Sequence, residues 1–165
     1  MVLGKVLAIA GMEKGFNVTW FPSYGAEVRG GTAHCMVHIS SDQISSPVVF
    51  SATTAVVMNT PSLDKFEEKV VKGGLIIVNE SMVERDVKRK DLEVIKSPLT
   101  DEAIKIGNVR VANMIAVGIY AAKKNIIDRE TLVNVIEKMA GNRKELIPIN
   151  VKALDRGIEI AGGVK

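Results

Sequence analysis

Apolar residues follow a helical spacing at the start of the chain and a strand-like alternation soon afterwards. The spacing over residues 2–10 predicts a helix, which Gly15 would end. Residues 17–21 read as a strand stopped by Pro22, and residues 32–40 alternate apolar with polar side chains, as a second strand does. The connection is too short for a helical crossover, so we expect these two strands to be antiparallel.

Two short, continuous apolar runs rich in β-branched residues follow, at residues 53–58 and 74–78. Runs of this kind, bounded by turn residues, are typical of buried parallel strands. A helix is predicted between them, with Thr60 as its cap and Pro61 in its first turn. Its apolar side would consist of three residues, Leu63, Phe66 and Val70.

The second half of the chain reads mainly as helix. A short strand at residues 92–95 precedes four predicted helices, at residues 100–106, 111–124, 128–139 and 146–161. Gly107 and Gly141 would end the first and third of them, and Asp128 would cap the third. Small residues would let the helix at 111–124 lie close to the sheet. Strands that alternate with helices predict a three-layer α/β/α, Rossmann-like fold with a mostly parallel sheet, in a single domain over residues 1–165.

The composition is that of an ordinary globular domain. The chain has 165 residues, of which 47% are hydrophobic and 25% charged. The formal charge is only +3, and acidic residues interrupt the densest basic run, residues 85–91. We interpret this run as a solvated face and expect no nucleic-acid partner, while a basic surface can attract an acidic partner such as a small electron carrier.

Cysteine usage and hydropathy bear on the compartment. Cys35 is the only cysteine, so no intrachain disulfide can form. No signal peptide is visible, and no apolar run approaches the roughly 18 residues of a membrane span. We therefore expect no membrane partner and a cytoplasmic location.

One loop combines residue types that a simple connection does not need. Residues 23–31, SYGAEVRGG, place three glycines, which permit close backbone approach, beside an acidic and a basic side chain. Arg29 can donate two hydrogen bonds to an anion, and exposed N–H groups can cradle one. The alternative is a tight loop in which Glu27 and Arg29 are solvated. The candidate residues of this loop are Ser23, Tyr24, Gly25, Glu27, Arg29, Gly30 and Gly31.

Three other places carry polar side chains of interest. His34 and His38 share one face of a predicted strand and Cys35 lies on the other, which favours hydrogen-bonded histidines over a metal site. Residues 79–81 follow a strand, where α/β sheets bind ligands, or form a connection in which the serine caps a helix. Asn113, in an apolar helix, would bind a ligand or hold a neighbouring loop, and the need of a buried amide for partners favours the second. These residues do not form a complete active site.

Three segments of the chain, taken together, carry a recognisable pattern. Residues 18–33 read VTWFPSYGAEVRGGTA, residues 107–114 read GNVRVANM, and residues 48–59 contain an apolar run. These segments resemble the gamma subunits of 2-oxoacid:ferredoxin oxidoreductases, which have the pattern S-Y-G-x-E-x-R-G-G after a short strand, a G-N-x-x-x-A-N-M helix opening, and a new β-α unit beginning where residues 48–59 stand. The resemblance covers nearly the whole chain.

The resemblance implies a non-autonomous subunit of a hetero-oligomeric enzyme, beside alpha, beta and ferredoxin-like delta subunits. Such a complex decarboxylates a 2-oxoacid on thiamine diphosphate, passes electrons through iron–sulfur clusters to ferredoxin and forms an acyl-CoA. Thiamine and clusters would lie on other subunits, which agrees with a chain whose single cysteine cannot supply the roughly four thiolates of a cluster. This subunit would shape the site and contribute to coenzyme A binding. Arg29 would pair with a phosphate or carboxylate or be fixed by Glu27, and Tyr24 would pack at the subunit junction.

One departure from the family pattern concerns the start of the sequence. The family has a strand and a G-x-G-G-Q-G turn before the helix matched by residues 3–10, and this sequence starts inside that helix. We expect lower stability or self-association relative to a version extended upstream. Rival hypotheses are an indolepyruvate oxidoreductase subunit, a free-standing nucleotide-binding module and a purely structural spacer. Residues 20–22 and 32–35 resemble the 2-oxoglutarate or branched-chain types more than the pyruvate type.

Overall fold

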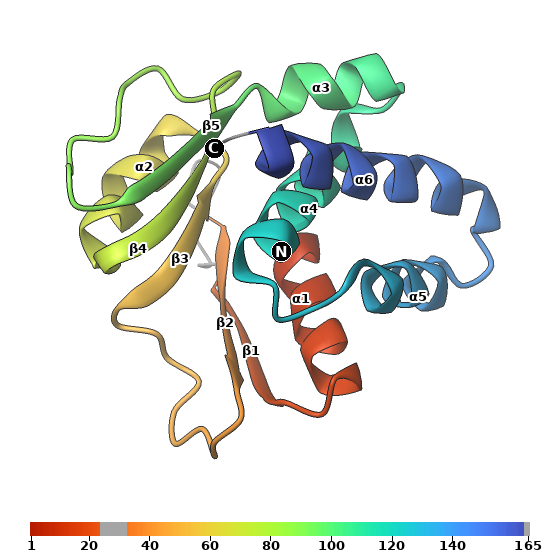
Figure 1. Cartoon of the computed structure of the whole chain (residues 1–165), viewed down its shortest axis with the longest axis horizontal. Coiled ribbons are helices and arrows are strands. Elements are labelled where there is room, and N and C mark those ends of the chain that lie inside the picture. The colour runs from red at the N-terminus through yellow and green to blue at the C-terminus, as the bar shows by residue number, and fades with distance from the viewer. Residues whose placement is uncertain (24–32, 164–165) are drawn as a thin grey trace. The chain divides into compact units, whose positions relative to one another are not determined.

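The computed structural model describes residues 1–23 and 33–163 (Figure 1). Contacts divide the chain into two compact units. The first holds Met1–Val49 and Lys124–Ile147, and the second holds Phe50–Lys123 and Pro148–Lys165. Each unit therefore draws on two separate stretches of the chain. None of the described helices is long and apolar enough to cross a membrane.

The first unit contains a two-stranded antiparallel sheet. Its elements are α1 (Val2–Glu13), β1 (Asn17–Ser23), β2 (His34–Ser40), α5 (Arg129–Ala140) and the 3-10 turn η3 (Lys144–Leu146). The antiparallel pairing of β1 with β2 is confirmed. The predicted stop at Pro22 is wrong, because β1 continues through it to Ser23. A proline fits an edge strand where its missing N–H is not needed for the ladder.

Two glycines bring α1 close to one face of the β1–β2 pair. A methyl group at Gly4 would strike Sγ of Cys35, and one at Gly11 would lie 3.0 Å from Cγ2 of Val18. Side chains of both strands therefore touch the helix where it carries no side chain of its own. This contact fixes the hairpin against α1.

Exposed ion pairs fasten α5 to the end of α1. Nζ of Lys14 lies 2.7 Å from Oδ2 of Asp128, and Nζ of Lys138 lies 2.7 Å from Oε1 of Glu13. Asp128 also caps α5, as predicted, because its Oδ1 accepts a hydrogen bond from the backbone N of Thr131 at 2.8 Å. The two helices are thus joined through polar groups at their ends.

The second unit contains a three-stranded parallel sheet in the order β3-β4-β5. Its elements in chain order are β3 (Ala52–Val57), α2 (Thr60–Phe66), η1 (Glu67–Lys69), β4 (Val70–Asn79), β5 (Glu93–Ser97), α3 (Leu99–Ile106), η2 (Val109–Val111), α4 (Ala112–Lys124) and α6 (Ile147–Gly163). The parallel pairing of the two apolar runs is confirmed. β4 reaches β5 through residues 80–92, a connection without a helix.

One face of this sheet packs on α2. Leu63 of α2 and Val87 of the 80–92 connection are buried together with Val57, Ile76 and Val78 of the strands. α4 and α6 lie on the other side of the strands (Figure 1). Helices on both faces of a parallel sheet confirm the α/β class that the alternating pattern predicts.

The opposite face of the sheet is covered by α4, which runs antiparallel to the strands. Lys123, near the end of α4, places its Nζ 3.5 Å from Oε1 of Glu93 at the start of β5.

The small residues of α4 were expected to let the helix lie close to the sheet, but Gly118 lets it lie close to another helix, α6. A methyl group there would strike the carbonyl oxygen of Leu154 on α6 and lie 2.9 Å from Cα of Gly157.

Two predicted details of α2 are wrong. Its N-cap is Asn59 rather than Thr60, because Oδ1 of Asn59 accepts a hydrogen bond from the backbone N of Ser62 at 3.0 Å. Val70 is the first residue of β4 and does not continue the apolar side of the helix.

The end of α3 agrees with the prediction, because Gly107 follows it with a left-handed φ of 115°, which favours glycine.

Candidate functional site

The predicted loop is the connection between β1 and β2. Ser23 ends β1 and lies opposite His34, the first residue of β2, so both ends of the loop are held in one antiparallel pair. This end of the hairpin lies at the start of α1, because Sγ of Cys35 is 4.0 Å from the backbone O of Met1. Six of the predicted residues lie outside the described part of the chain: Tyr24, Gly25, Glu27, Arg29, Gly30 and Gly31. Their part in a site stays a prediction.

The histidines of β2 are arranged as the alternation predicts. Cys35 faces α1, so His34 and His38 lie on the opposite face of the strand. Within residues 1–23 and 33–163, no three His, Cys, Asp or Glu side chains come together as metal ligands would. The described residues thus offer no argument for a metal centre at β2.

Polar side chains at the carboxyl end of the parallel sheet cap α3. Asn79 is 1% exposed, and its Oδ1 accepts a hydrogen bond from the backbone N of Thr100 at 3.2 Å. Its amide nitrogen donates to Oγ1 of Thr100 at 2.9 Å and to the backbone O of Met58 at 3.3 Å. Oγ of Ser81 accepts from the backbone N of Asp101 at 3.2 Å. These interactions favour the capping hypothesis for residues 79–81, because N–H groups that could bind a ligand anion are taken by protein side chains.

Asn113 lies in the first turn of α4, at the same edge of the sheet. The direction of α4 follows from the pair between Lys123 and Glu93, which places the helix start at the carboxyl ends of the strands. Oδ1 of Asn113 is buried and has no hydrogen-bond partner among the residues that the structure describes. A buried acceptor without a partner costs about 1–3 kcal/mol. The amide is therefore a candidate contact for a ligand or a partner chain, and its role stays a prediction.

A buried carboxylate that the sequence pattern does not reveal, Glu67, holds the 80–92 connection. Its Oε1 accepts hydrogen bonds from the backbone N of Lys88 at 2.5 Å and of Arg89 at 2.9 Å, and its Oε2 accepts from Arg85 at 2.8 Å. Burial opposes its charged form, but these hydrogen bonds hold the pKa of Glu67 below its ordinary value. The group is a structural anchor rather than a proton acceptor, because it is ionised and fully engaged at neutral pH.

A second buried carboxylate, Glu102 of α3, is engaged in the same way. Nζ of Lys105 and Nε of Arg156 each lie 2.7 Å from one of its oxygens. Both cations lower the pKa of Glu102, Lys105 most strongly. Because Arg156 comes from α6, this pair ties α3 to α6, which no local sequence pattern could show.

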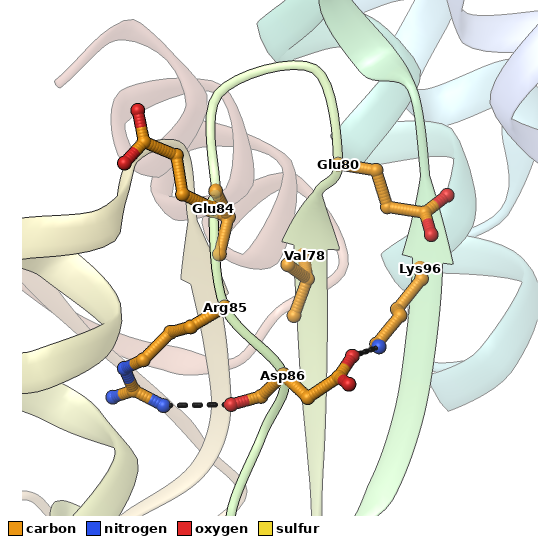
Figure 2. A pocket seen from close by; sticks show the side chains of 7 residues that line it. Val78, Glu80, Glu84, Arg85, Asp86 and Lys96 are labelled. Carbon is orange, nitrogen blue, oxygen red and sulfur yellow. Dashed lines mark hydrogen bonds and ion pairs between the residues drawn. The ribbon is translucent and has the colours of Figure 1, made fainter.

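A polar hollow of about 200 Å³ opens beside β4 and β5. Its lining consists of Val78, Glu80, Val83, Glu84, Arg85, Asp86 and Lys96. Figure 2 shows Arg85 and Asp86 turned to opposite sides of the 80–92 connection. Asp86 pairs with Lys96, which lowers the pKa of Asp86, while Nε of Arg85 lies 2.6 Å from Oδ1 of Asp64. The lining holds no serine, cysteine or histidine that could act as a nucleophile, so only its carboxylates could accept a proton.

Comparison with known sequences places these features in a family. The model of the family described as pyruvate ferredoxin/flavodoxin oxidoreductase matches residues 1–160. Ketoisovalerate oxidoreductase subunit VorA of Methanothermobacter marburgensis is 32% identical over 160 residues, or 96% of this chain, which spans about a third (33%) of VorA. 2-Oxoglutarate synthase subunit KorC of Methanocaldococcus jannaschii is 27% identical over 98% of this chain and 84% of KorC.

Solved structures share the fold. The gamma subunit of a keto/oxoacid ferredoxin oxidoreductase from Geobacter sulfurreducens matches 99% of this chain and 91% of its own, with a TM-score of 0.84 and 22% identity. A 2-oxoglutarate:ferredoxin oxidoreductase from Magnetococcus marinus, with 2-oxoglutarate, coenzyme A and succinyl-CoA bound, matches all of this chain and 29% of its own. That match has a TM-score of 0.89 and 22% identity, a level at which the likeness concerns the fold.

Proposed function

We propose that this chain, which belongs to the pyruvate ferredoxin/flavodoxin oxidoreductase family, is a gamma-type subunit of a 2-oxoacid:ferredoxin oxidoreductase and forms a single gamma-type domain over residues 1–165. The observation that carries the proposal is the extent of the family match, residues 1–160. The chain spans 84% of KorC, which is named as a subunit, and 33% of VorA. A segment of this length therefore corresponds to most of the separate subunit KorC and to about a third of the longer chain VorA.

The whole complex would convert a 2-oxoacid and coenzyme A into an acyl-CoA and CO₂, and would transfer two electrons to ferredoxin. Thiamine diphosphate and the iron–sulfur clusters would be held by alpha, beta and delta subunits. The donor set of this chain does not fit a cluster, because its one cysteine, Cys35, faces the backbone of α1 and a cluster needs about four thiolates. We therefore assign this chain binding and positioning, and no chemical step.

The part proposed for this chain is to hold coenzyme A beside the subunit junction. Arg29 would donate to a phosphate group, and Gly30 and Gly31 would let the backbone approach it. Tyr24 would pack against a partner subunit. Separately from the loop, Asn113 of the second unit has a buried Oδ1 without a partner among the described residues, which makes it a candidate contact for a ligand or a partner chain.

A free-standing nucleotide-binding module is less well supported by the described residues. Open α/β sheets bind phosphates at helix N-termini beyond the carboxyl ends of their strands. Here Asn59 caps α2, and Asn79 and Ser81 occupy first-turn N–H groups of α3. Protein side chains thus already satisfy donors that a nucleotide would use at the helix starts after β3 and β5.

Assembly is the first test of the proposal. We expect the chain, co-expressed with alpha, beta and delta subunits, to copurify with them and to support coenzyme A-dependent reduction of ferredoxin. Parallel assays with 2-oxoglutarate, 2-oxoisovalerate and pyruvate would identify the substrate. Activity with indolepyruvate alone would favour the indolepyruvate oxidoreductase alternative. Failure to copurify, or oxidation of a 2-oxoacid by the isolated chain, would contradict the proposal.

The proposed role of the loop is tested by Arg29→Ala in the assembled complex. We expect KM for coenzyme A to rise roughly tenfold, the effect of losing one charge-assisted hydrogen bond. Arg143→Ala is the matched control, because Arg143 is an exposed arginine of the same unit. Unchanged coenzyme A kinetics with intact assembly would remove Arg29 from the site and favour the structural spacer.

A further inference from the structure

The basic run at residues 85–91 is interrupted by two acids in the sequence, and the fold pairs one with a lysine outside the run and the other with Arg89 of the run itself. Asp86 pairs with Lys96 on β5, on the side of the hollow that Figure 2 shows. Asp91 accepts hydrogen bonds from Nη2 and Nε of Arg89 at 2.6 and 3.0 Å. Neutralising these acids leaves Lys88 and Lys90 of the same run exposed.

The fold brings lysines from a second stretch beside this run. Glu67 of η1 accepts hydrogen bonds from the backbone N of Lys88 and Arg89, so the run lies along η1. The backbone N of Gly73 donates to the O of Asp91 at 2.8 Å, so the run also borders the start of β4. Lys69 and Lys72 belong to these neighbouring segments and are exposed.

We refer to Lys69, Lys72, Lys88 and Lys90 as the basic face. Within residues 1–23 and 33–163, none of their four ammonium groups forms an ion pair within 4.0 Å. Of the acids in residues 64–73 and 85–91, Glu68 alone has no ion pair in the described part of the chain. These four lysines therefore form a local positive surface, although the two stretches together carry a formal charge of only +2, from seven basic and five acidic residues.

The basic face has no apolar centre. None of the exposed large apolar side chains of the described residues lies in residues 64–73 or 85–91. The nearest aromatic ring, Phe66, is half-buried, with Nζ of Lys65 and Lys69 over it at 5.5 and 5.6 Å. Permanent subunit interfaces have an apolar core and are depleted in lysine, whereas electron-transfer contacts are small and guided by charge. This composition fits a partner that binds briefly.

We propose that the basic face is the docking surface for an acidic electron-carrier protein of the ferredoxin class. The inference rests on the proposed function, because an enzyme that delivers electrons to a protein carrier needs such a transient contact. Four exposed ammonium groups would attract an acidic carrier over a distance of about one Debye length, roughly 10 Å at 0.1 M salt. The clusters that donate the electrons would remain on other subunits.

Charge reversal in the reconstituted complex tests the docking surface. We expect Lys88→Glu/Lys90→Glu to raise KM for ferredoxin about tenfold at low salt and to flatten the dependence of the rate on ionic strength. Lys152→Glu is the matched control, because Lys152 is an exposed lysine of α6, on the other face of the sheet. The control should change KM for ferredoxin less than twofold.

A small artificial electron acceptor separates this inference from the proposed function. If the wild-type complex reduces neither ferredoxin nor the dye with a 2-oxoacid, the proposed function fails. If the dye rate is unchanged in the double variant while KM for ferredoxin rises, the docking surface is supported. An unchanged KM for ferredoxin would overturn the inference. So would loss of subunit copurification, because the face would then belong to a permanent interface.

Discussion

Glycine permits a close helix contact in both units, but what lies opposite the glycine differs. In the first unit, a methyl group at Gly4 of α1 would meet Sγ of Cys35, a side-chain atom. In the second unit, a methyl group at Gly118 of α4 would meet the carbonyl oxygen of Leu154 on α6. A side chain can rotate away from an intruding methyl group, whereas a helix backbone can only move as a whole.

Two paired carboxylates, one from each unit, also differ in their exposure. The side chain of Glu67 in the second unit is 3% exposed and holds a connection through backbone N–H groups and Arg85. The side chain of Asp128 in the first unit is 49% exposed and pairs with Lys14 at the surface. At Gly118 and Glu67 the second unit thus relies on contacts that cannot adjust, while at Gly4 and Asp128 the first unit relies on contacts that can.

The largest expected effect on stability is that of Gly118→Ala. The added methyl group would meet backbone atoms of both Leu154 and Gly157, so α4 and α6 would have to separate. We expect the free energy of unfolding to fall by about 3 kcal/mol or more, the upper end for overpacked sites. Urea denaturation followed by circular dichroism measures it.

Gly162→Ala is the matched control for this prediction, because nothing lies within 4 Å of a methyl group added there and Gly162 belongs to α6, the helix that Gly118 of α4 contacts. Its effect should stay within about 0.5 kcal/mol, since the residue is in the last turn. Equal urea midpoints for Gly118→Ala and Gly162→Ala would mean that the α4–α6 crossing is looser than the structure shows.

Glu67→Gln is expected to be the next most damaging change. It removes the charge that accepts hydrogen bonds from Arg85 and from the backbone N of Lys88 and Arg89. We expect a loss of about 2 kcal/mol in the free energy of unfolding at neutral pH. Glu68→Gln, at the exposed neighbouring residue, should change stability far less.

The pH dependence sharpens this prediction. Because hydrogen bonds lower the pKa of Glu67 in the folded chain, its contribution is fully present above the ordinary value of 4.5 and is lost as pH falls through the lower folded value. The difference in stability between wild type and Glu67→Gln should therefore shrink below about pH 4.5. A difference that persists undiminished in acid would argue against the carboxylate as the anchor.

Sequence patterns located most elements because periodicity reports how each residue is buried locally. They could not identify contacts between distant segments. The small size of Gly118 indicated a close approach, but only the fold shows that α6 approaches it. Glu67 looked like any surface acid, since its partners lie more than fifteen residues away, from Arg85 onward. Pro22 was predicted to end its strand, although an edge strand tolerates proline.

The candidate site likewise has a part that local sequence predicted and a part that depends on contacts between distant segments. Composition and family pattern pointed to the loop at residues 23–31, and the fold shows how its first residue, Ser23, is fixed opposite His34. The capping role of Asn79 depends on Thr100, which is distant in sequence. No local rule can assign such a partner, so the sequence left two hypotheses open there.

Gly4→Ala tests whether the side chain of Cys35 can move away from an added methyl group, as the contrast with Gly118 requires. Overpacking against Cys35 would cost about 1–3 kcal/mol, and replacing a helical glycine by alanine would return up to about 1 kcal/mol. We therefore expect a net loss of about 1 kcal/mol. In Gly4→Ala/Cys35→Ala the sulfur is gone, so most of the loss should be recovered relative to Cys35→Ala alone. Strictly additive effects of the two substitutions would contradict the proposed clash.

The smallest expected effect comes from Asp128, whose two roles can be separated. Asp128→Asn keeps an oxygen that can cap Thr131 but loses the ion pair with Lys14, while Asp128→Ala loses both. Hydrogen bonding from Lys14 lowers the pKa of Asp128, so the ionic contribution is present above the ordinary value of 3.8 and disappears as pH falls below it. The melting temperature should fall slightly in Asp128→Asn and further in Asp128→Ala. Added salt should remove only the difference between wild type and Asp128→Asn, because salt screens exposed charges. If Asp128→Asn destabilised the chain as much as Glu67→Gln does, exposure of the pair would not matter and the contrast between the two units would fail.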